Sequence, residues 1–342
     1  MCPGAPAVAR RALFAGVFLS LIPGCTVSLP MSLGSNGEIA VVTDAESGDP
    51  RLEALLTALR EPVRWSRDEP RFRPAVVPPA GFDARRHARC LAFILDLDVP
   101  GSLAGPLRRL LAGADLDSMR AKPFAFRVVQ DAWARGQSIL VVHARGAEGA
   151  VALGREASEM IAALEEGITT ALVSVVLQDG EDRAAGERLA RDFGFTLRVP
   201  RGWRLGGDPA PGAARLYRVD ERNGACFLLI ASLPADLAPR DPESLLALRE
   251  RLATAWSDGD HVDPLSSVAR AGSFQRRPAT FIEGTWQNAN DSIGGLFRCC
   301  AFVRGGRFFL VDAVVFQPRE EKIPILREVM AMAETFRLME EP

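Results

Sequence analysis

A short apolar segment that ends at Cys25 is the feature that most constrains how this chain folds. Arg10-Arg11 precede an apolar run from Ala12 to Gly24, and this order is typical of a cleaved secretory leader. The run ends in Leu21-Ile22-Pro23-Gly24-Cys25, which has the pattern of a bacterial lipobox. A membrane-spanning helix needs about 20 apolar residues, and charged residues interrupt every later apolar run. We therefore predict a leader over residues 1–24, followed by a water-soluble body.

Cys25 is the predicted site of lipidation, with palmitate or similar fatty acids. A single acyl chain gives only marginal membrane binding, so stable anchoring requires more than one. The alternative is an ordinary secretory signal that is cleaved elsewhere, with Cys25 incidental. The lipobox favours a protein of the bacterial cell envelope that is anchored through Cys25, at the outer membrane and facing the periplasm. Residues 25–36 would form a polar tether.

Composition excludes several classes of protein. The chain has 342 residues, of which 48% are hydrophobic and 25% charged, as in globular proteins. The formal net charge of −2 argues against a nucleic-acid partner or a polybasic membrane face. Lys122 and Lys322 are the only lysines, so arginine carries nearly all the positive charge.

The cysteines permit a disulfide without requiring one. Besides Cys25, the predicted mature chain contains Cys90, Cys226, Cys299 and Cys300. Adjacent cysteines on a strand point to opposite faces, so Cys226 could pair with only one of Cys299 and Cys300. The alternative is that all four are small buried thiols. Their spacing does not indicate a metal site.

Hydrophobic patterning divides the body at Phe193. Before it, strands are expected over 37–44, 90–97 and 137–143, with helices that begin at Asp49-Pro50, over 103–111, over 124–135 and over most of 148–191. After it, apolar and polar residues alternate in strands, with helices over 241–256 and 322–336 and a hairpin at Gly305-Gly306. We predict an α+β protein with two α/β units, over 37–192 and 193–342.

Short motifs along the chain carry a resemblance to a known family. They are Gly37-Glu38-Ile39-x-Val41-Val42, Glu69-Pro70-x-Phe72, Asp131-Ala132-Trp133-Ala134-x-x-Gln137, Phe193-Gly194 with Val199-Pro200-x-Gly202-Trp203, Gly284-x-Trp286 with Gly294-Gly295-x-Phe297, and Pro318 with Lys322 and Arg327. In these motifs the chain resembles an uncharacterised family of bacterial envelope lipoproteins, a domain of unknown function. The resemblance implies lipidation and an α/β body, and it carries over no activity and no catalytic residue. The second half also resembles the PsbP-like α/β/α sandwich, an antiparallel sheet with helices on both faces.

Residues of the kind that catalyse reactions do not form a recognisable constellation. The histidines His87, His143 and His261 lie far apart and have no partner at metal-ligand spacing. We interpret His143 as a surface or loop residue. Asp96 and Asp98 would share a strand face and could suggest paired carboxylates, but turn chemistry before Val99-Pro100-Gly101 is the favoured explanation. We therefore assign no catalytic residue, no metal and no cofactor.

Aromatic residues near turns are the candidates for binding. Trp65 and Trp203 lie beside arginine or glycine, and Trp286 follows Gly284 by two positions. Exposed aromatics beside arginines are common in binding patches. Trp203 and Trp286 could form a shared aromatic floor on one sheet, or each could fill the end of its own core.

Two hypotheses of function follow. The first is a lipid-anchored, non-catalytic binding or assembly module with an envelope protein or peptide as partner. The second is a periplasm-facing hydrolase that uses carboxylates from separate segments.

Overall fold

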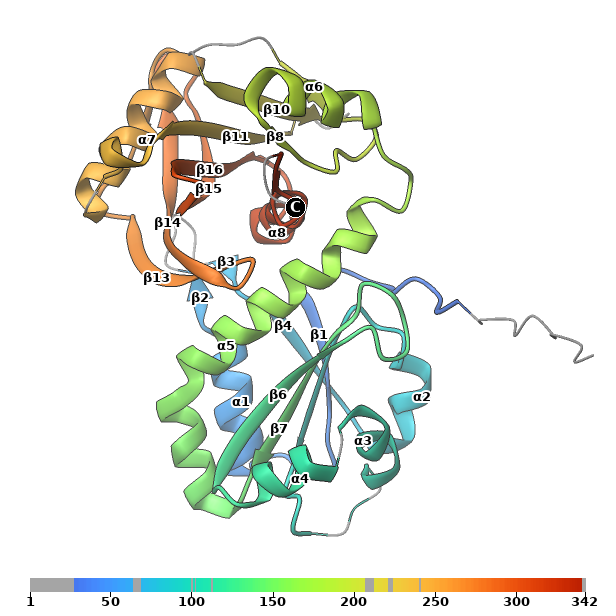
Figure 1. Cartoon of the computed structure of the whole chain (residues 1–342). Coiled ribbons are helices and arrows are strands. Elements are labelled where there is room, and N and C mark those ends of the chain that lie inside the picture. Colours follow the sequence, from blue (N-terminus) through green and yellow to red (C-terminus); the bar gives the residue numbers. More distant parts are fainter. Residues whose placement is uncertain are drawn as a thin grey trace, which may run out of the picture.

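The structure is a computed structural model that describes residues 28–339 except 64–68, 100, 102, 112, 207–211, 221–223 and 240. Its helices and strands form two groups along the chain, which Figure 1 shows one above the other. The long helix α5 (Gly146–Val176) runs from the first group toward the second. Within this described part, no helix is long and apolar enough to cross a membrane.

The first group is a largely parallel sheet between two layers of helices. Its strands are β1 (Glu38–Val42), β4 (Arg73–Val77), β5 (Cys90–Leu95), β6 (Phe124–Gln130) and β7 (Ser138–Ala144), in the order β4-β1-β5-β7-β6. Only β6 pairs antiparallel among them. Its helices besides α5 are α1 (Pro50–Arg60), α2 (Phe82–Arg85), α3 (Ala104–Leu110) and α4 (Gly113–Arg120), with a 3-10 turn at Pro79–Gly81 and a small hairpin of β2 (Pro62–Val63) and β3 (Glu69–Pro70).

Alternation along the strands creates the two cores of this sheet. Val41 and Ala92 pack on one face with α1 and α5, while Val42 and Phe93 pack on the other face against α3 and its neighbours. Because side chains alternate between faces and both faces are covered, the central strands β5 and β7 are buried and largely apolar along their length.

The second group is built on a long antiparallel sheet. Its strands are β9 (Arg204–Leu205), β10 (Ala213–Val219), β11 (Ala225–Pro234), β12 (Asp260–Val262), β13 (Val268–Phe274), β14 (Arg277–Asn288), β15 (Ile293–Arg304) and β16 (Arg307–Phe316). They follow the order β12-β14-β15-β16-β11-β10-β9, and β13 also pairs with β14. The helices are α6 (Arg183–Phe193), α7 (Pro242–Trp256) and α8 (Lys322–Ala333), with a 3-10 turn at Ala235–Leu237 and a separate pair of β8 (Phe195–Thr196) and β17 (Arg337–Leu338).

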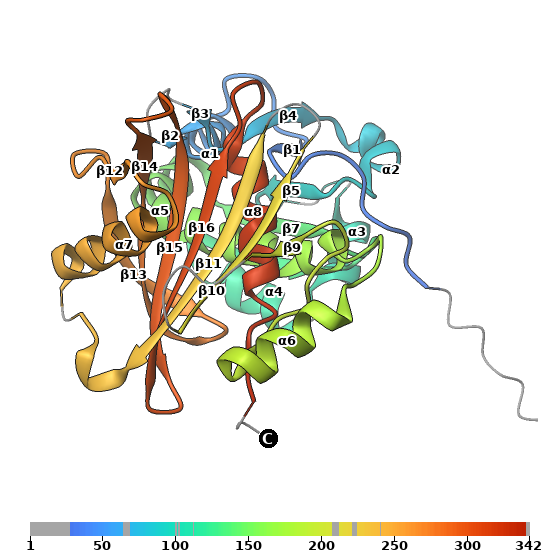
Figure 2. The same ribbon diagram turned by 90° about the horizontal axis from the view of Figure 1, so that it is seen from above.

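Helices cover both faces of the second sheet. Viewed from above in Figure 2, α7 lies on one face and α8 and α6 lie on the other. Leu245 and Leu248 bring α7 into the first of these cores, while Leu189 of α6 and Leu326 of α8 belong to the second. The predicted α+β class, with a helix-flanked antiparallel sheet in the second half, is confirmed.

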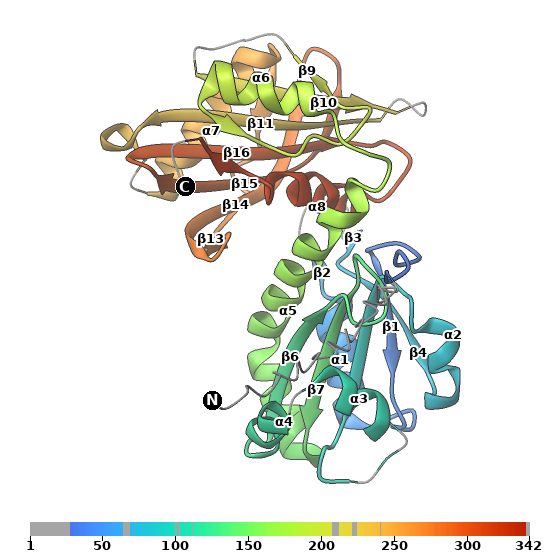
Figure 3. The ribbon, with the colours of Figure 1, turned by 45° about the vertical axis from the view of Figure 1, so that its right-hand side comes forward.

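Helix α8 also joins the two groups. Figure 3 shows it between the second sheet and α5, and its residue Ala331 is fully buried in the core of the first sheet. Helix α6 ends at Phe193, so nearly all of it lies before the predicted boundary, yet it contributes Leu189 to the core of the second sheet. The domain boundary at 192/193 stays a prediction.

Several local expectations agree with the structure. The side chains of Asp49 and Asp241 accept hydrogen bonds from backbone N–H groups in the first turns of α1 and α7, as helix N-caps do. Gly305 and Gly306 both have positive φ, 55° and 70°, as the tightest hairpin turn between two strands requires.

Two expectations about the first half are wrong. Residues 124–135, expected as a helix, contain strand β6, in which Phe124 and Phe126 face one core while Ala125 faces the other. This alternation has the period of a strand, which outweighs the helical interpretation. The tether is shorter than expected, because Ser32 and Asn36 are buried and Ser32 Oγ donates a hydrogen bond to Gly136 O at 2.9 Å.

Candidate functional site

A cavity of about 760 Å³, here called the open cavity, lies where the ends of β14, β15 and β16 meet the β2–β3 hairpin and the start of α8. Its lining comprises Glu69, His261, Thr285, Trp286, Gln287, Asn288, Ala289, Ser292, Ile293, Gly294, Gly295, Leu296, Phe316, Gln317, Pro318 and Lys322. Motifs that are distant in sequence, from Glu69 to Lys322, are therefore brought together here. The volume falls within the range of about 300–1,000 Å³ that is typical of ligand pockets.

Trp286 forms a wall of the open cavity because Gly295 leaves room for its ring. The two residues are cross-strand partners on β14 and β15. A Cβ atom at Gly295 would lie 3.0 Å from Trp286 Nε1 and would collide with the carbonyl oxygen of Val315. The glycine thus permits close backbone approach while a large ring covers it. Trp286 itself is 4% exposed.

Glu69 and Lys322 connect the two groups across the mouth of this cavity. Lys322 Nζ lies 3.2 Å from Glu69 Oε1, and the backbone N–H of Lys322 donates to Glu69 Oε2 at 2.9 Å. Lys322 is the first residue of α8, and the N-cap residue Glu321 makes no side-chain cap. A carboxylate of the first group therefore caps a helix of the second.

A smaller cavity of about 120 Å³, here called the apolar chamber, lies between α7 and the second sheet. Its lining comprises Arg215, Ala225, Phe227, Leu229, Arg249, Ala253, Trp256, Ser257, Asp260, Trp286, Ile293, Val314 and Phe316. Trp286, Ile293 and Phe316 line the open cavity as well. The chamber and the open cavity therefore share a wall.

A buried ion pair lies at the chamber. Arg249 of α7 donates from Nε to Asp312 Oδ2 of β16 at 2.8 Å, and both side chains are almost fully buried. The guanidinium also lies 4.0 Å from the centroid of the Phe297 ring. Burial raises the pKa of Asp260, another lining residue, although Asn288 donates to its carboxylate at 2.7 Å.

Several polar atoms around these two cavities are buried without a hydrogen-bond partner among the described residues. The donors belong to residues that line the chamber and are Arg215 Nε, Arg249 Nη1, Trp256 Nε1 and Trp286 Nε1. In the open cavity, the side chain of Gln317 is 1% exposed; its Nε2 donates to Asp220 while Oε1 accepts nothing. An unpaired buried polar group costs about 1–3 kcal/mol, so these groups favour an occupant that pairs with them.

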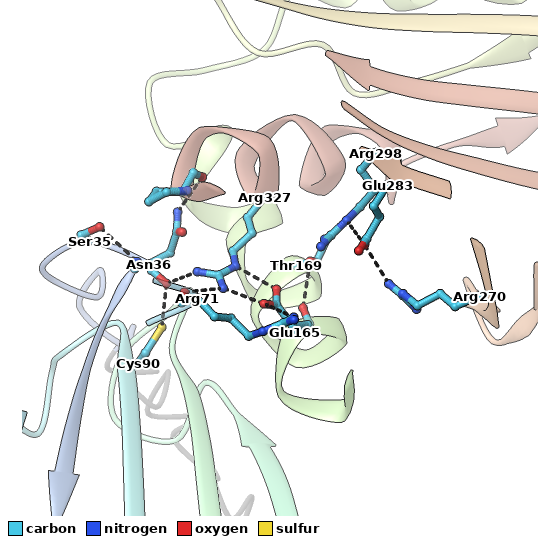
Figure 4. A network of polar contacts seen from close by, with 12 residues as sticks. Ser35, Asn36, Arg71, Cys90, Glu165, Thr169, Arg270, Glu283, Arg298 and Arg327 are labelled. Carbon is cyan, nitrogen blue, oxygen red and sulfur yellow. Dashed lines mark hydrogen bonds and ion pairs between the residues drawn. The ribbon is translucent and has the colours of Figure 1, made fainter. Parts of the chain in front are cut away.

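A second polar network joins the groups away from the open cavity and the apolar chamber (Figure 4). Arg327 of α8 binds both carboxylate oxygens of Glu165 on α5, at 2.8 and 2.7 Å. It also donates to the backbone carbonyls of Asn36 at 2.8 Å and of Arg71 at 3.0 Å. Burial alone would raise the pKa of Glu165, but the charge and hydrogen bonds of Arg327 outweigh it and lower that pKa to about 2.

The predicted tryptophans are not brought together. Trp203 is 6% exposed and packs in the core beneath α6 and α8, whereas Trp286 packs in the core beneath α7 on the opposite face of the sheet. The predicted shared aromatic floor is therefore wrong, and Trp203 is a core residue. Trp286 remains a candidate for binding. Trp65 and the lipidation site Cys25 lie outside the described residues.

The disulfide that the sequence permits between Cys226 and Cys299 or Cys300 is absent from the described structure, where these three residues and Cys90 are free, buried thiols. Cys226 lies opposite Val315 of β16, while Cys299 and Cys300 lie opposite Asp312 and Val311 on the other side of that strand. A whole strand therefore separates Cys226 from either partner, about 10 Å at the usual strand spacing. This separation is too large for a disulfide.

His143 is fully buried, so its interpretation as a surface residue is wrong. Its Nδ1 accepts a hydrogen bond from Leu97 N at 3.1 Å, and burial lowers its pKa. One nitrogen or oxygen atom from each of His143, Asp96 and Asp98 lies within 4.8 Å of the others. However, Asp96 accepts from Asp98 N at 3.0 Å, as in a turn, and Asp98 pairs with Arg145 at 2.7 Å. These contacts use part of the acceptor capacity of the three side chains in turn and surface-pair interactions, and we assign no metal to this group.

A further cavity of about 280 Å³ brings carboxylates together between α5, β13 and α8. Glu166 and Glu334 both line it, with Arg270 and Arg298 among the other lining residues. Burial, and to a lesser extent the charge of Glu166, raise the pKa of Glu334 to about 7.

Sequence reasoning missed Arg249, Trp256 and Gln317 as parts of a site. One signal was present, because Asp312 is a carboxylate within the apolar strand Arg307–Phe316. A buried charge in such a strand requires a partner. The position of that partner on α7 depends on the tertiary fold and could not be read from spacing.

Comparison with known proteins confirms the resemblance to a domain of unknown function. Residues 182–335 match the model of the domain of unknown function DUF4837. A search of curated proteins finds no match.

Three solved structures each match less than half of this chain. A protein of Bacteroides thetaiotaomicron VPI-5482 is 12% identical with a TM-score of 0.28, and the match covers 43% of this chain and 46% of that one. Cyanobacterial PsbP (CyanoP) of Synechocystis sp. PCC 6803 is 14% identical with a TM-score of 0.31, and the match covers 42% and 86%. LpqN of Mycobacterium tuberculosis, described as involved in cell envelope biogenesis, is 14% identical with a TM-score of 0.27, and the match covers 42% and 81%.

Proposed function

We propose that this chain is a lipid-anchored, non-catalytic binding or assembly module of the bacterial cell envelope, and that it binds at the open cavity beside Trp286. The lipobox at Cys25 supports the location at an envelope membrane. The outer membrane, facing the periplasm, is the proposed site of anchoring.

The open cavity is the observation that carries the proposal. It combines an aromatic wall, Trp286, with an unpaired buried acceptor, Gln317 Oε1. Pockets that bind ligands are typically lined by aromatic residues with a few precisely placed polar groups. The Glu69–Lys322 pair holds the β2–β3 hairpin against the start of α8. Both groups of the fold therefore contribute to the lining.

Hydrolysis by paired carboxylates is not favoured at this cavity. Such chemistry needs two carboxylates, one of them acting as general acid. Among the described lining residues Glu69 is the only carboxylate, and it pairs with Lys322 at 3.2 Å.

The hydrolase stays a second candidate because of the cavity that contains Glu166 and Glu334. These residues come from separate helical segments, and a carboxyl with a pKa of about 7 is suited to general acid catalysis near neutral pH. A panel of fluorogenic ester and glycoside substrates would test it. Turnover that is abolished by Glu334→Gln would support the hydrolase, and equal turnover by the variant would exclude this pair.

Photocrosslinking in living cells tests the binding proposal. Ala289 is exposed and lines the open cavity, so a photoreactive benzoylphenylalanine at this position would face an occupant. The matched control is the same substitution at Ala84, an exposed residue of α2.

The proposal predicts an adduct of discrete mass at position 289, either a small molecule or a protein, that is missing at position 84. Equal labelling at both positions, or no discrete adduct at 289, would contradict it.

A further inference from the structure

The apolar chamber beside Trp286 presents donors that lack acceptors. Arg249 Nη1, Trp256 Nε1 and Trp286 Nε1 are shielded from solvent and have no partner among the described residues. The rest of the wall is largely aliphatic or aromatic, including Phe227, Ile293 and other apolar side chains of the sheet. The chamber therefore suits an apolar group that carries a hydrogen-bond acceptor, reached by small rotations of these side chains.

Charge balance decides which acceptor fits. The cations that line the chamber, Arg215 and Arg249, are matched by the carboxylates of Asp260, in the same lining, and Asp312, which binds Arg249 at 2.8 Å. A ligand carboxylate would add an uncompensated negative charge to an apolar site, which is strongly unfavourable. An uncharged carbonyl oxygen accepts the same N–H groups without that cost. An ester or amide carbonyl therefore fits better than a free acid.

The open cavity presents the complementary feature, an acceptor that lacks a donor. Gln317 Oε1 is buried and unpaired within the described part of the chain. A hydroxyl group would donate to it. Trp286, Ile293 and Phe316 line both spaces, so one molecule that passes along this wall can occupy both.

From these three observations we infer that the site takes a neutral acylated polyol. Its short acyl chain and carbonyl occupy the apolar chamber, and its hydroxyl-bearing head lies in the open cavity. This inference rests on the proposed binding function and names the chemical class of the ligand.

Titration calorimetry with matched small probes tests the ligand class. The full chain with Cys25→Ser, which lacks acyl groups of its own, is titrated with 1-monohexanoylglycerol, 1-O-hexylglycerol and hexanoate. The first two differ only in the carbonyl, and the third replaces the neutral ester by a charged acid and lacks the glycerol head. The ester is expected to bind about 2- to 12-fold more tightly than the ether, the factor that one hydrogen bond contributes. Hexanoate is expected to bind most weakly.

Two variants assign the binding to the chamber. Trp256→Phe removes one N–H donor while keeping an aromatic ring. It should therefore weaken binding of the ester by the same factor and leave binding of the ether unchanged. Ala253→Leu fills the chamber from α7 and should abolish binding of both. Ala247→Leu, on the exposed face of the same helix, should have no effect.

Each contrary result overturns the inference. These results are equal affinity for ester and ether, tightest binding of hexanoate, unaltered ester binding by Ala253→Leu, or no binding of the ester. A discrete photocrosslink at position 289 together with any of them would leave the binding function standing and reject only the ligand class.

Discussion

The buried pair of Glu165 and Arg327 is predicted to be a main source of stability at the junction of the two groups. Replacing Glu165 by glutamine removes the negative charge but keeps the size of the side chain. Arg327 is fully buried, so its charge would remain without compensation. Its hydrogen bonds to the carbonyls of Asn36 and Arg71 would not neutralise it.

The magnitude follows from the pKa of Glu165. Arg327 lowers this pKa from 4.5 to about 2 against the opposing effect of burial. At about 1.36 kcal/mol per pKa unit, the ionised carboxylate contributes about 3 kcal/mol at neutral pH. Removing one partner of a buried pair typically costs about 3–5 kcal/mol. Both routes predict that Glu165→Gln lowers the free energy of unfolding by at least about 3 kcal/mol at pH 7.

The sign of the pH dependence is also fixed. A lowered carboxyl pKa contributes stability that is complete above the unfolded pKa of 4.5 and is lost as the pH falls toward 2. The contribution should therefore fall from about 3 kcal/mol at pH 7 to roughly half of that at pH 3. The difference between the wild-type protein and Glu165→Gln should narrow accordingly.

Urea unfolding followed by far-ultraviolet circular dichroism measures this effect. The control is Asp192→Asn, which removes the exposed partner of Arg191 and should cost less than about 1 kcal/mol. The double variant Glu165→Leu with Arg327→Met should recover part of the loss, because replacing a buried pair by apolar residues is often neutral. A loss below about 1 kcal/mol for Glu165→Gln, no larger than the control, would refute the reasoning.

Four further predictions concern other parts of the molecule. Trp203→Ala should cost about 3–5 kcal/mol in urea unfolding without changing binding at the open cavity, since Trp203 is a core residue. Glu69→Gln should lose about 1 kcal/mol, because its pairing with Lys322 and part of the α8 cap weaken. Glu334→Gln should be more stable than the wild-type protein at pH 8, by up to about 3 kcal/mol, and equally stable at pH 4, because a raised carboxyl pKa makes ionisation unfavourable in the fold. Cys25→Ser should abolish incorporation of radiolabelled palmitate, and continued labelling would reject the lipobox.

The fold was predictable from sequence where local chemistry determines it. Asp49-Pro50 and Asp241-Pro242 specify helix starts, and Gly305-Gly306 specifies a hairpin turn, because these residues satisfy backbone needs within a few positions. The wrong prediction of a helix over residues 124–135 also came from considering only neighbouring residues. A strand with apolar residues on both faces lacks simple polar alternation and resembles a buried helix until its neighbours are known.

Of the candidate site at the open cavity, only Trp286 and the nearby glycines could be predicted from the sequence. Trp286 and Gly295 were visible as unusual residues near turns, but their pairing depends on the register of β14 and β15. Arg249 and Asp312 lie 63 positions apart in the sequence, and Glu69 and Lys322 lie 253 positions apart. Contacts at such separations are set by how the sheets pack. The burial of Trp203 on the opposite face of the sheet from Trp286 is likewise set by this packing.

The central claim, that the cavities beside Trp286 bind a ligand, is tested most directly by the indole N–H signals in a nitrogen-15 correlation spectrum. The chain has five tryptophans, and point variants assign their signals. On titration with 1-monohexanoylglycerol, the signals of Trp256 and Trp286 should move downfield as their unpaired N–H groups gain an acceptor, while that of Trp203 stays in place. Unmoved signals for Trp256 and Trp286, or an equal shift for Trp203, would contradict the account.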